Sequence, residues 1–255
     1  MVRLYRKLKQ KLFFDGKTEK YFKYAISEII LIVIGILIAL TINNRKELQN
    51  EQGQEILSYC ELKRDVQLDK NRIITIIESL DKRQLICRQL LIKLHSTPKD
   101  KSTLIDDYLP AIRPNVFYPN KAALTDIISS GKLSLLRNKE LKKMIINYYN
   151  NMENSLRIVY SNQEAVTDRI FQLDNFTEFG VHQHFIYKDE FGRELTDLLT
   201  SVSWHRDKNH PYFKKFENDI VAAILVNARE KQLLKGILDK AEPLLLSLNK
   251  ACNIQ

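Results

Sequence analysis

An uninterrupted apolar run near the N-terminus constrains this chain more than any other feature. The stretch KYFKYAISEIILIVIGILIALTINNRKE, residues 20–47, carries one charge between Lys23 and Arg45, namely Glu28. A helix over residues 25–42 is about 27 Å long, close to the roughly 30 Å hydrocarbon core of a bilayer. A signal peptide has a shorter apolar region, of about 7–15 residues, followed by small residues at a cleavage site. The motif ALTINN fits such a site poorly, so we interpret residues 25–42 as an uncleaved transmembrane helix, with a cleaved signal and a soluble core helix as the alternatives.

The flanks of this run predict its orientation. The N-terminal flank is rich in basic residues, namely Arg3, Arg6, Lys7, Lys9, Lys11, Lys17, Lys20 and Lys23. Because basic residues beside a span stay in the cytoplasm, we expect residues 1–24 inside and residues 43–255 outside. The predicted location is the inner (cytoplasmic) membrane, single-pass, with a periplasmic C-terminal domain. Residues 1–24 are too few for a folded output domain, so we do not expect a receptor kinase or a DNA-binding regulator.

The charge distribution argues against a nucleic-acid partner. The chain has 255 residues and a formal net charge of +9, and the basic excess is concentrated before the apolar run. A nucleic-acid-binding domain places basic residues on a folded face together with aromatic residues or a recognition helix. Since no such pattern follows the run, we expect no nucleic-acid binding.

Apolar residues recur with helical spacing over most of the remaining chain. With only 7 Gly and 6 Pro, the composition favours helices, and we predict an all-α fold. A stripe at every seventh residue predicts a long helix over residues 46–95: Tyr59, Val66, Ile73, Leu80, Cys87 and Leu94. A second predicts a helix over residues 139–173: Ile145, Met152, Val159, Val166 and Leu173. Because polar residues such as Asp69 and Arg83 interrupt the first stripe, we expect a bundle rather than a two-stranded coiled coil.

Proline and glycine punctuate the segments between these helices. Pro110, Pro114 and Pro119 predict an extended or turn-rich connector. Asn120 is a candidate N-cap for a short helix through Ile128, and Gly131 is a candidate stop.

The region after the second long helix is less regular. Residues 176–210 read as an irregular insertion with a short helix near residues 193–202, and VHQHFIY reads as a brief strand or a loop. Pro211 opens the final helix, which we expect Pro243 to kink or end. The fold class is thus all-α, with one N-terminal transmembrane helix followed by an extracytoplasmic bundle of long helices with an irregular insertion.

Residues capable of chemistry are few. The concentrated candidates for metal ligands are His182, His184, His205 and His210. On an extended segment, His-x-His points both imidazoles to one face, as zinc and copper sites use. No helical His-Glu-x-x-His pattern, Gly-rich phosphate loop, Gly-x-Ser-x-Gly elbow or Cys-x-x-Cys pair accompanies them, so we predict no catalytic or cofactor-binding residues and read these histidines as ordinary loop residues. Asn175-Phe-Thr reads as a chance glycosylation sequon.

The three cysteines cannot all pair within one chain. Cys60 and Cys87 lie about 40 Å apart on a continuous helix, beyond the roughly 7 Å limit for a disulfide. We read Cys87 as a small core residue. Cys60 and Cys252 are less constrained, and an oxidising periplasm would allow an intermolecular bridge through either.

The residues around the apolar run also resemble a known family. YAISEIILIVIGILIALTINN, preceded by the basic VRLYRKLKQKL, is similar to the N-terminal signature of the uncharacterised domain-of-unknown-function family six-zero-nine-zero, small single-span membrane proteins from Bacteroidetes-type bacteria. The chain departs from that signature at Ser27, Thr41 and Arg45, where Gly, Gln and Trp are usual. AALTDIISSGKLSLLRNKELKKMIINYYN resembles the family too. The resemblance implies one span and an outer helical domain, but no activity.

Two classes of function follow from these observations. The first is a membrane-anchored helical interaction or scaffold module of the cell envelope, with the lipid bilayer and an unknown envelope protein as partners. The second is an envelope metal-dependent enzyme that uses the segment bearing the four histidines. Gly35 and Ala39 have the small-x-x-x-small spacing that lets two spans approach closely, so a homodimer through these residues is a further prediction.

Overall fold

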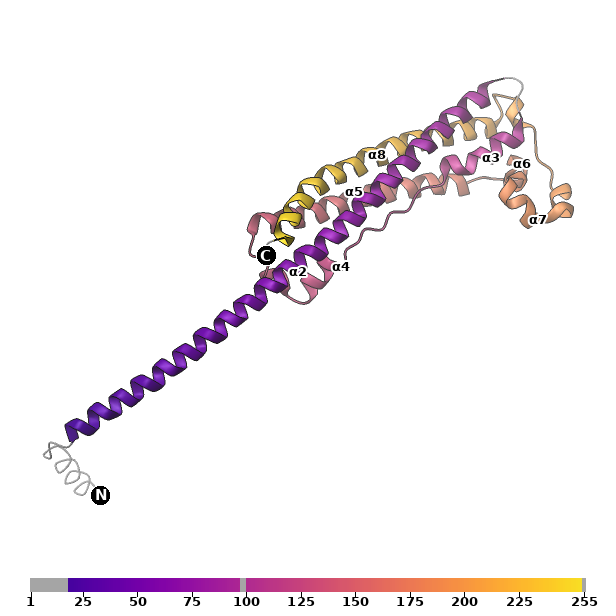
Figure 1. Ribbon diagram of the computed structural model, residues 1–255. Coiled ribbons are helices and arrows are strands. Elements are labelled where there is room, and N and C mark those ends of the chain that lie inside the picture. The colour runs from indigo at the N-terminus through magenta and orange to yellow at the C-terminus, as the bar shows by residue number, and fades with distance from the viewer. Residues whose placement is uncertain (1–17, 97–99, 254–255) are drawn as a thin grey trace, which may run out of the picture. The chain divides into compact units, whose positions relative to one another are not determined.

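The predicted all-α architecture is confirmed in a computed structural model that describes residues 18–96 and 100–253 (Figure 1). No strand occurs in these residues. The α-helices are α2 (Thr18–His95), α3 (Lys101–Ile112), α4 (Ala122–Ser129), α5 (Lys139–Phe171), α6 (Phe176–Phe179), α7 (Phe185–Leu198) and α8 (Pro211–Cys252). Short 3₁₀ turns are η1 (Lys132–Ser134), η2 (Val181–Gln183) and η3 (Trp204–Arg206). The chain divides into two compact units, residues 1–55 and 56–255.

The first unit contains the N-terminal part of α2. All side chains from residue 22 to residue 50 are exposed, including the whole apolar run. Among the described residues this is the one helical stretch long and apolar enough, by length and composition, to cross a membrane. Most of the predicted basic segment, residues 1–17, lies outside the described residues.

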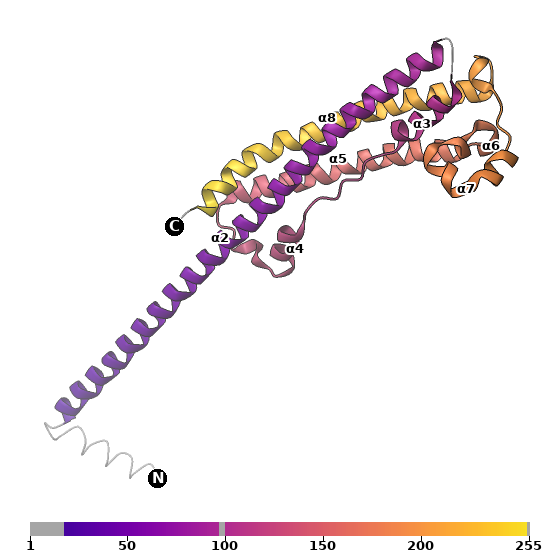
Figure 2. The same cartoon turned by 45° about the vertical axis from the view of Figure 1, so that its right-hand side comes forward.

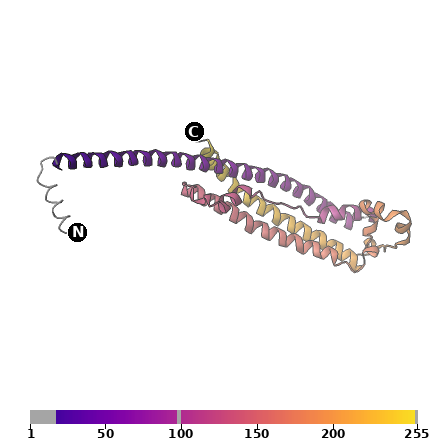
Figure 3. The same cartoon turned by 90° about the horizontal axis from the view of Figure 1, so that it is seen from below.

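The second unit is a bundle in which the later part of α2 lies alongside α5 and α8 in three views (Figures 1, 2 and 3). The predicted seven-residue stripes of α2 and α5 are buried, from Tyr59 to Leu94 and from Ile145 to Val166. Burial of these stripes supplies the main driving force for packing, at about 25 cal/mol per Å² of apolar surface. The bundle prediction is therefore confirmed.

A layer of polar side chains separates the buried apolar residues into two clusters. The first cluster includes Leu80 and Leu234, and the second includes Cys87 and Ala223. Between them lies what we call the polar layer, made of Arg83, Gln163, Asn227 and Glu230, all at most 8% exposed. Arg83 Nη1 donates to Asn227 Oδ1 at 3.1 Å, and Gln163 Nε2 donates to Glu230 Oε2 at 3.0 Å. The interruption at Arg83 in the apolar stripe thus corresponds to a paired, buried group.

The predicted connector was partly wrong, because α3 runs through Pro110 to Ile112. A segment without regular secondary structure begins only at Arg113 and continues to Lys121. The prediction of Asn120 as an N-cap was also wrong. Two carboxylates of α2 accept hydrogen bonds from backbone N–H groups near the start of α4 instead. Asp65 Oδ2 accepts from the Ala123 N–H at 2.9 Å, and Asp69 Oδ1 accepts from the Asn120 N–H at 2.9 Å.

The end of α4 and the start of α8 agree with their predictions. Gly131 follows α4 with φ of 72°, a left-handed conformation that favours glycine. Pro211 is the first residue of α8. Pro243 does not end α8, which continues to Cys252.

The cysteines pair differently from the prediction. Cys60 and Cys252 form an intrachain disulfide within the second unit, with Cα atoms 5.1 Å apart. The prediction of an intermolecular bridge through either residue was therefore wrong. Folding back of α8 along α2 brings together positions 192 residues apart in sequence. Cys87 is fully buried, as predicted for a core residue. Burial raises the pKa of its thiol to about 11.

Candidate functional site

The predicted histidine segment does not adopt the extended conformation that His-x-His ligation requires. His182 lies in η2, and His184 lies between η2 and α7, so the expectation of a strand or loop at VHQHFIY was wrong. His184 Nδ1 accepts from the Ile186 N–H at 3.1 Å and caps α7, while His210 Nδ1 accepts from the Tyr212 N–H at 3.1 Å and caps α8. In these two histidines Nδ1 is therefore already engaged as an N-cap hydrogen-bond acceptor.

His184 also explains how α3 tolerates its proline. Pro110 lacks the N–H that an α-helix directs to the carbonyl four residues earlier, which is that of Asp106. His184 lies within 3.2 Å of this oxygen through Nε2. Because Nδ1 accepts a hydrogen bond, Nε2 carries the proton and donates to the Asp106 carbonyl. A residue from another segment thus satisfies the carbonyl that Pro110 leaves open.

The other two histidines are buried at 3% and 4% exposure, His182 near Lys101 and His205 edge-on to Trp204 with ring centroids 6.1 Å apart. Burial, and then the charge of Lys101, lowers the pKa of His182. Within the described part of the chain no group of three His, Cys, Asp or Glu residues is placed to hold a metal ion. No observation favours the metal-dependent enzyme.

A buried aromatic cluster fixes the segments around these histidines. Phe179 stacks on Trp204 with centroids 5.1 Å apart, and Tyr108 stacks on Phe216 at 5.0 Å. Trp204 Nε1 donates to the Phe179 carbonyl at 2.8 Å. Lys101 Nζ donates to the Val202 carbonyl at 2.7 Å and lies 5.8 Å from the Trp204 ring. Burial lowers the pKa of Lys101 to about 8.

Residues 176–202, which include α6 and α7, carry a set of exposed apolar side chains. We call it the α6–α7 surface and define it by Phe176, Phe185, Ile186, Phe191, Leu195, Leu198 and Val202, which are 37–74% exposed. No residue of α7 is buried. Isolated exposed apolar residues are normal on a protein surface, but concentrations of them mark interaction sites. The α6–α7 surface is therefore the candidate interaction site.

The charge of this segment differs from that of the rest of the chain. Residues 174–202 carry six acidic residues, namely Asp174, Glu178, Asp189, Glu190, Glu194 and Asp197, and two basic residues, namely Lys188 and Arg193. Their formal net charge is −4, whereas the whole chain is +9. The candidate site is thus an acidic region of a basic protein.

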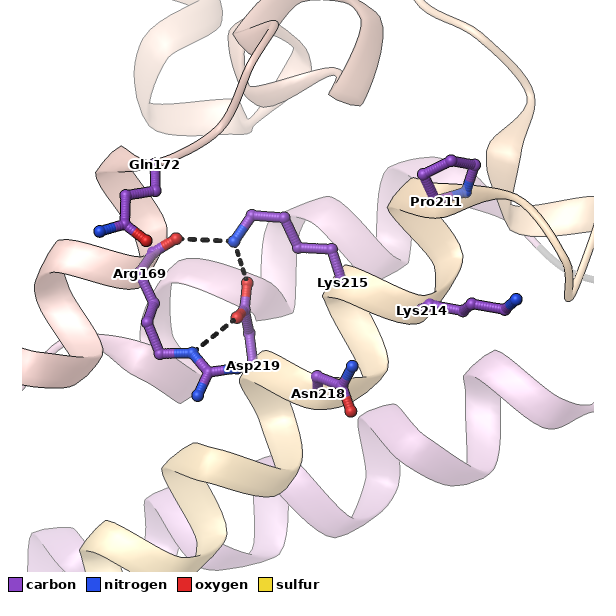
Figure 4. Close-up of a pocket in the computed structure, with 7 residues that line it drawn as sticks. All are labelled: Arg169, Gln172, Pro211, Lys214, Lys215, Asn218 and Asp219. Carbon is purple, nitrogen blue, oxygen red and sulfur yellow. Dashed lines mark hydrogen bonds and ion pairs between the residues drawn. The ribbon is translucent and has the colours of Figure 1, made fainter.

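A polar hollow of about 560 Å³ lies between the end of α5 and the start of α8 (Figure 4). Lys215 Nζ donates to Asp219 Oδ2 at 3.0 Å and to the Arg169 carbonyl at 2.6 Å. Tyr108 Oη also donates to Asp219 Oδ2, at 2.7 Å. Figure 4 shows the Arg169 side chain directed at the same carboxylate. Two of the cations that line the hollow, Lys215 and Arg169, thus already pair with the buried carboxylate of Asp219. We therefore assign the hollow a structural role.

Comparison with protein families supports the predicted resemblance. The model of a family described as "Family of unknown function (DUF6090)" matches residues 28–174, which is more than half of the chain. The chain belongs to family DUF6090. A search of curated proteins and a search of solved structures gave no significant match.

In this DUF6090 protein the family match ends just before the candidate site. It covers α2 from residue 28 onward and the helices α3 to α5, while α6, α7 and α8 lie beyond it. The α6–α7 surface therefore belongs to the part of the chain that the family match does not cover.

Sequence reasoning missed the α6–α7 surface, although two signals point to it. Asn175-Phe-Thr is an N-cap motif, because Asn175 Oδ1 accepts from the N–H groups of Thr177 and Glu178 at 3.0 and 3.1 Å. The second signal is five large apolar residues between Phe185 and Leu198, mixed with charged residues.

Proposed function

We propose that this DUF6090 protein is a single-pass membrane protein of the cell envelope whose outer helical domain is an interaction or scaffold module. The N-terminus lies in the cytoplasm, the apolar part of α2 spans the inner membrane, and the second unit lies in the periplasm. The length and exposure of the apolar run support the anchor. The basic residues before the run support the orientation.

The Cys60–Cys252 disulfide carries this proposal. Structural disulfides persist in oxidising compartments and are rare in the cytosol, where thiols are kept reduced. The disulfide lies in the second unit, which is the part that the flanking charges assign to the outside. Two independent lines of reasoning, one from charge and one from thiol chemistry, thus agree on the same side of the membrane.

Side-chain arrangement favours interaction over catalysis. The buried charged groups Arg83, Glu230 and Asp219 have polar partners within the bundle. The large apolar side chains of the α6–α7 surface are exposed instead. An interaction module needs such a surface on a rigid support, and it needs no reactive group.

Reporter fusions test the topology. A reporter that is active only outside the cytoplasm should work after Gln255, and one that is active only inside should not. The disulfide provides a second readout: alkylation of denatured protein from cells quenched with acid should modify Cys87 alone until a reductant exposes Cys60 and Cys252. An active cytoplasmic reporter, together with three thiols free before reduction, overturns the proposal.

The proposed assembly includes a homodimer through Gly35 and Ala39. Gly35 and Ala39 lie four residues apart on one face of the helix, and both positions are exposed. Close approach of two backbones at small residues gives dispersion contacts that favour pairing in lipid.

A further inference from the structure

The α6–α7 surface concentrates exposed apolar side chains more than the rest of the second unit does. Among the described residues of that unit, seven large exposed apolar side chains lie within residues 176–202, and fifteen are spread over all its other residues. The number of large exposed apolar side chains per residue is thus about three times higher in residues 176–202 than in the rest of the unit. An apolar surface of this kind is stabilised when a partner removes it from water.

The support beneath this surface is already ordered. Phe185 donates its N–H to Asp106 Oδ1 at 3.0 Å, and Val202 donates its N–H to the Glu178 carbonyl at 3.0 Å. His184 ties the start of α7 to α3, and Trp204 ties η3 to α6. A preformed surface loses little conformational entropy when a partner docks.

The backbone at Gly192 gives α7 its shape. Gly192 has φ of 69° and ψ of 165°, which interrupts the helix between Phe191 and Arg193. Residues with a Cβ avoid this conformation, so glycine is needed there. Phe185 and Ile186 therefore stand on one short helical piece and Leu195 and Leu198 on another.

The net negative charge of residues 174–202 determines which partner fits. A second copy docked through the same surface brings two regions of charge −4 together, which disfavours a symmetric contact. An anionic lipid headgroup is repelled for the same reason. A partner with lysine and arginine around an apolar face gains both burial and charge complementarity.

We infer that the α6–α7 surface is a docking site for a partner protein that presents apolar side chains flanked by lysine and arginine. This inference rests on the proposed interaction function and names the surface and the partner chemistry. Apolar contacts supply affinity at the centre, while Asp189, Glu190, Glu194 and Asp197 set the partner's charge and speed its association.

Photo-crosslinking in intact cells tests the docking site with the full-length protein. Benzoylphenylalanine replaces Leu195 in one variant and Leu225, an exposed residue of α8, in a control variant. After illumination, Leu195 should give an adduct with one protein, and Leu225 should not. Mass spectrometry should place the crosslink in a partner segment with more Lys and Arg than Asp and Glu.

Charge reversal provides the matched control. Glu190→Lys combined with Glu194→Lys should reduce the Leu195 adduct about tenfold or more, because two attractive contacts become repulsive. Glu61→Lys combined with Glu164→Lys reverses two exposed acids elsewhere and should leave the adduct unchanged. Trp204 fluorescence verifies that each variant is folded.

Four outcomes overturn the inference: no adduct at Leu195, an adduct with a second copy, an adduct with lipid, or an adduct insensitive to Glu190→Lys and Glu194→Lys. The reporter after Gln255 distinguishes this failure from failure of the proposed function. If that reporter remains active outside while the adduct is absent, the surface assignment fails and the topology stands.

Discussion

Removal of the Cys60–Cys252 disulfide should destabilise the second unit strongly. The bridge joins positions 192 residues apart, and cross-linking a loop of that length lowers the entropy of the unfolded chain. The chain-entropy relation gives about 5 kcal/mol at 25 °C, and measured losses for native disulfides are about 2–5 kcal/mol. Because domains are stable by only about 5–15 kcal/mol, Cys60→Ser with Cys252→Ser should remove a large share of the stability.

The single tryptophan makes this measurement direct. Trp204 is the one Trp in the chain, lies in the second unit and is 1% exposed, so its fluorescence reports unfolding of that unit in the full-length protein. Guanidinium titration in detergent should show a lower midpoint for the double variant than for the wild type. A reductant should lower the wild-type midpoint similarly and leave the variant unchanged. A difference below about 1 kcal/mol, or equal sensitivity of both proteins to reductant, refutes the reasoning.

Three further predictions concern the polar layer, the half-buried Lys101 and the proposed membrane anchor. The charge of Arg83 stabilises the buried Glu230 carboxylate, so Arg83→Met should cost about 3 kcal/mol at pH 7. Because burial raises the pKa of Glu230, the loss should shrink in urea titrations at lower pH, and adding Glu230→Gln should recover part of it at pH 7. Burial lowers the pKa of Lys101 to about 8 in the folded protein, so the unfolded chain binds the proton of this lysine more tightly. Between about pH 8 and pH 10 the free energy of unfolding of the wild type should therefore rise relative to that of Lys101→Met. Gly35→Ile should reduce energy transfer between labelled chains in lipid vesicles about tenfold, while Leu37→Ile should not; equal transfer in both means that the anchor does not drive pairing.

The long helices could be predicted from sequence because burial repeats with the helical period. Apolar residues from Tyr59 to Leu94 and from Ile145 to Val166 occupy buried positions of α2 and α5. Proline positions were less informative. Pro110 signals a break only when the carbonyl of Asp106 stays unpaired, and its partner, His184, lies 78 residues away in sequence.

The candidate site was harder to predict than the fold. Sequence directs attention to histidines as ligands, yet His184 and His210 serve as helix caps. Cysteine number does not reveal that Cys60 pairs with Cys252, since that pairing depends on how α8 returns along α2. Apolar residues in α7 look like core residues until the structure shows that no residue of this helix is buried.

The polar layer also limits how the bundle can move. If α2 slid by one turn along α8, Arg83 would leave Asn227 and enter an apolar cluster, which costs several kcal/mol for an unpaired buried charge. Piston-like sliding between these helices is therefore blocked within the second unit. If a partner binds at the proposed docking site, the motion left to these two helices is rotation or tilt rather than a shift in helix register.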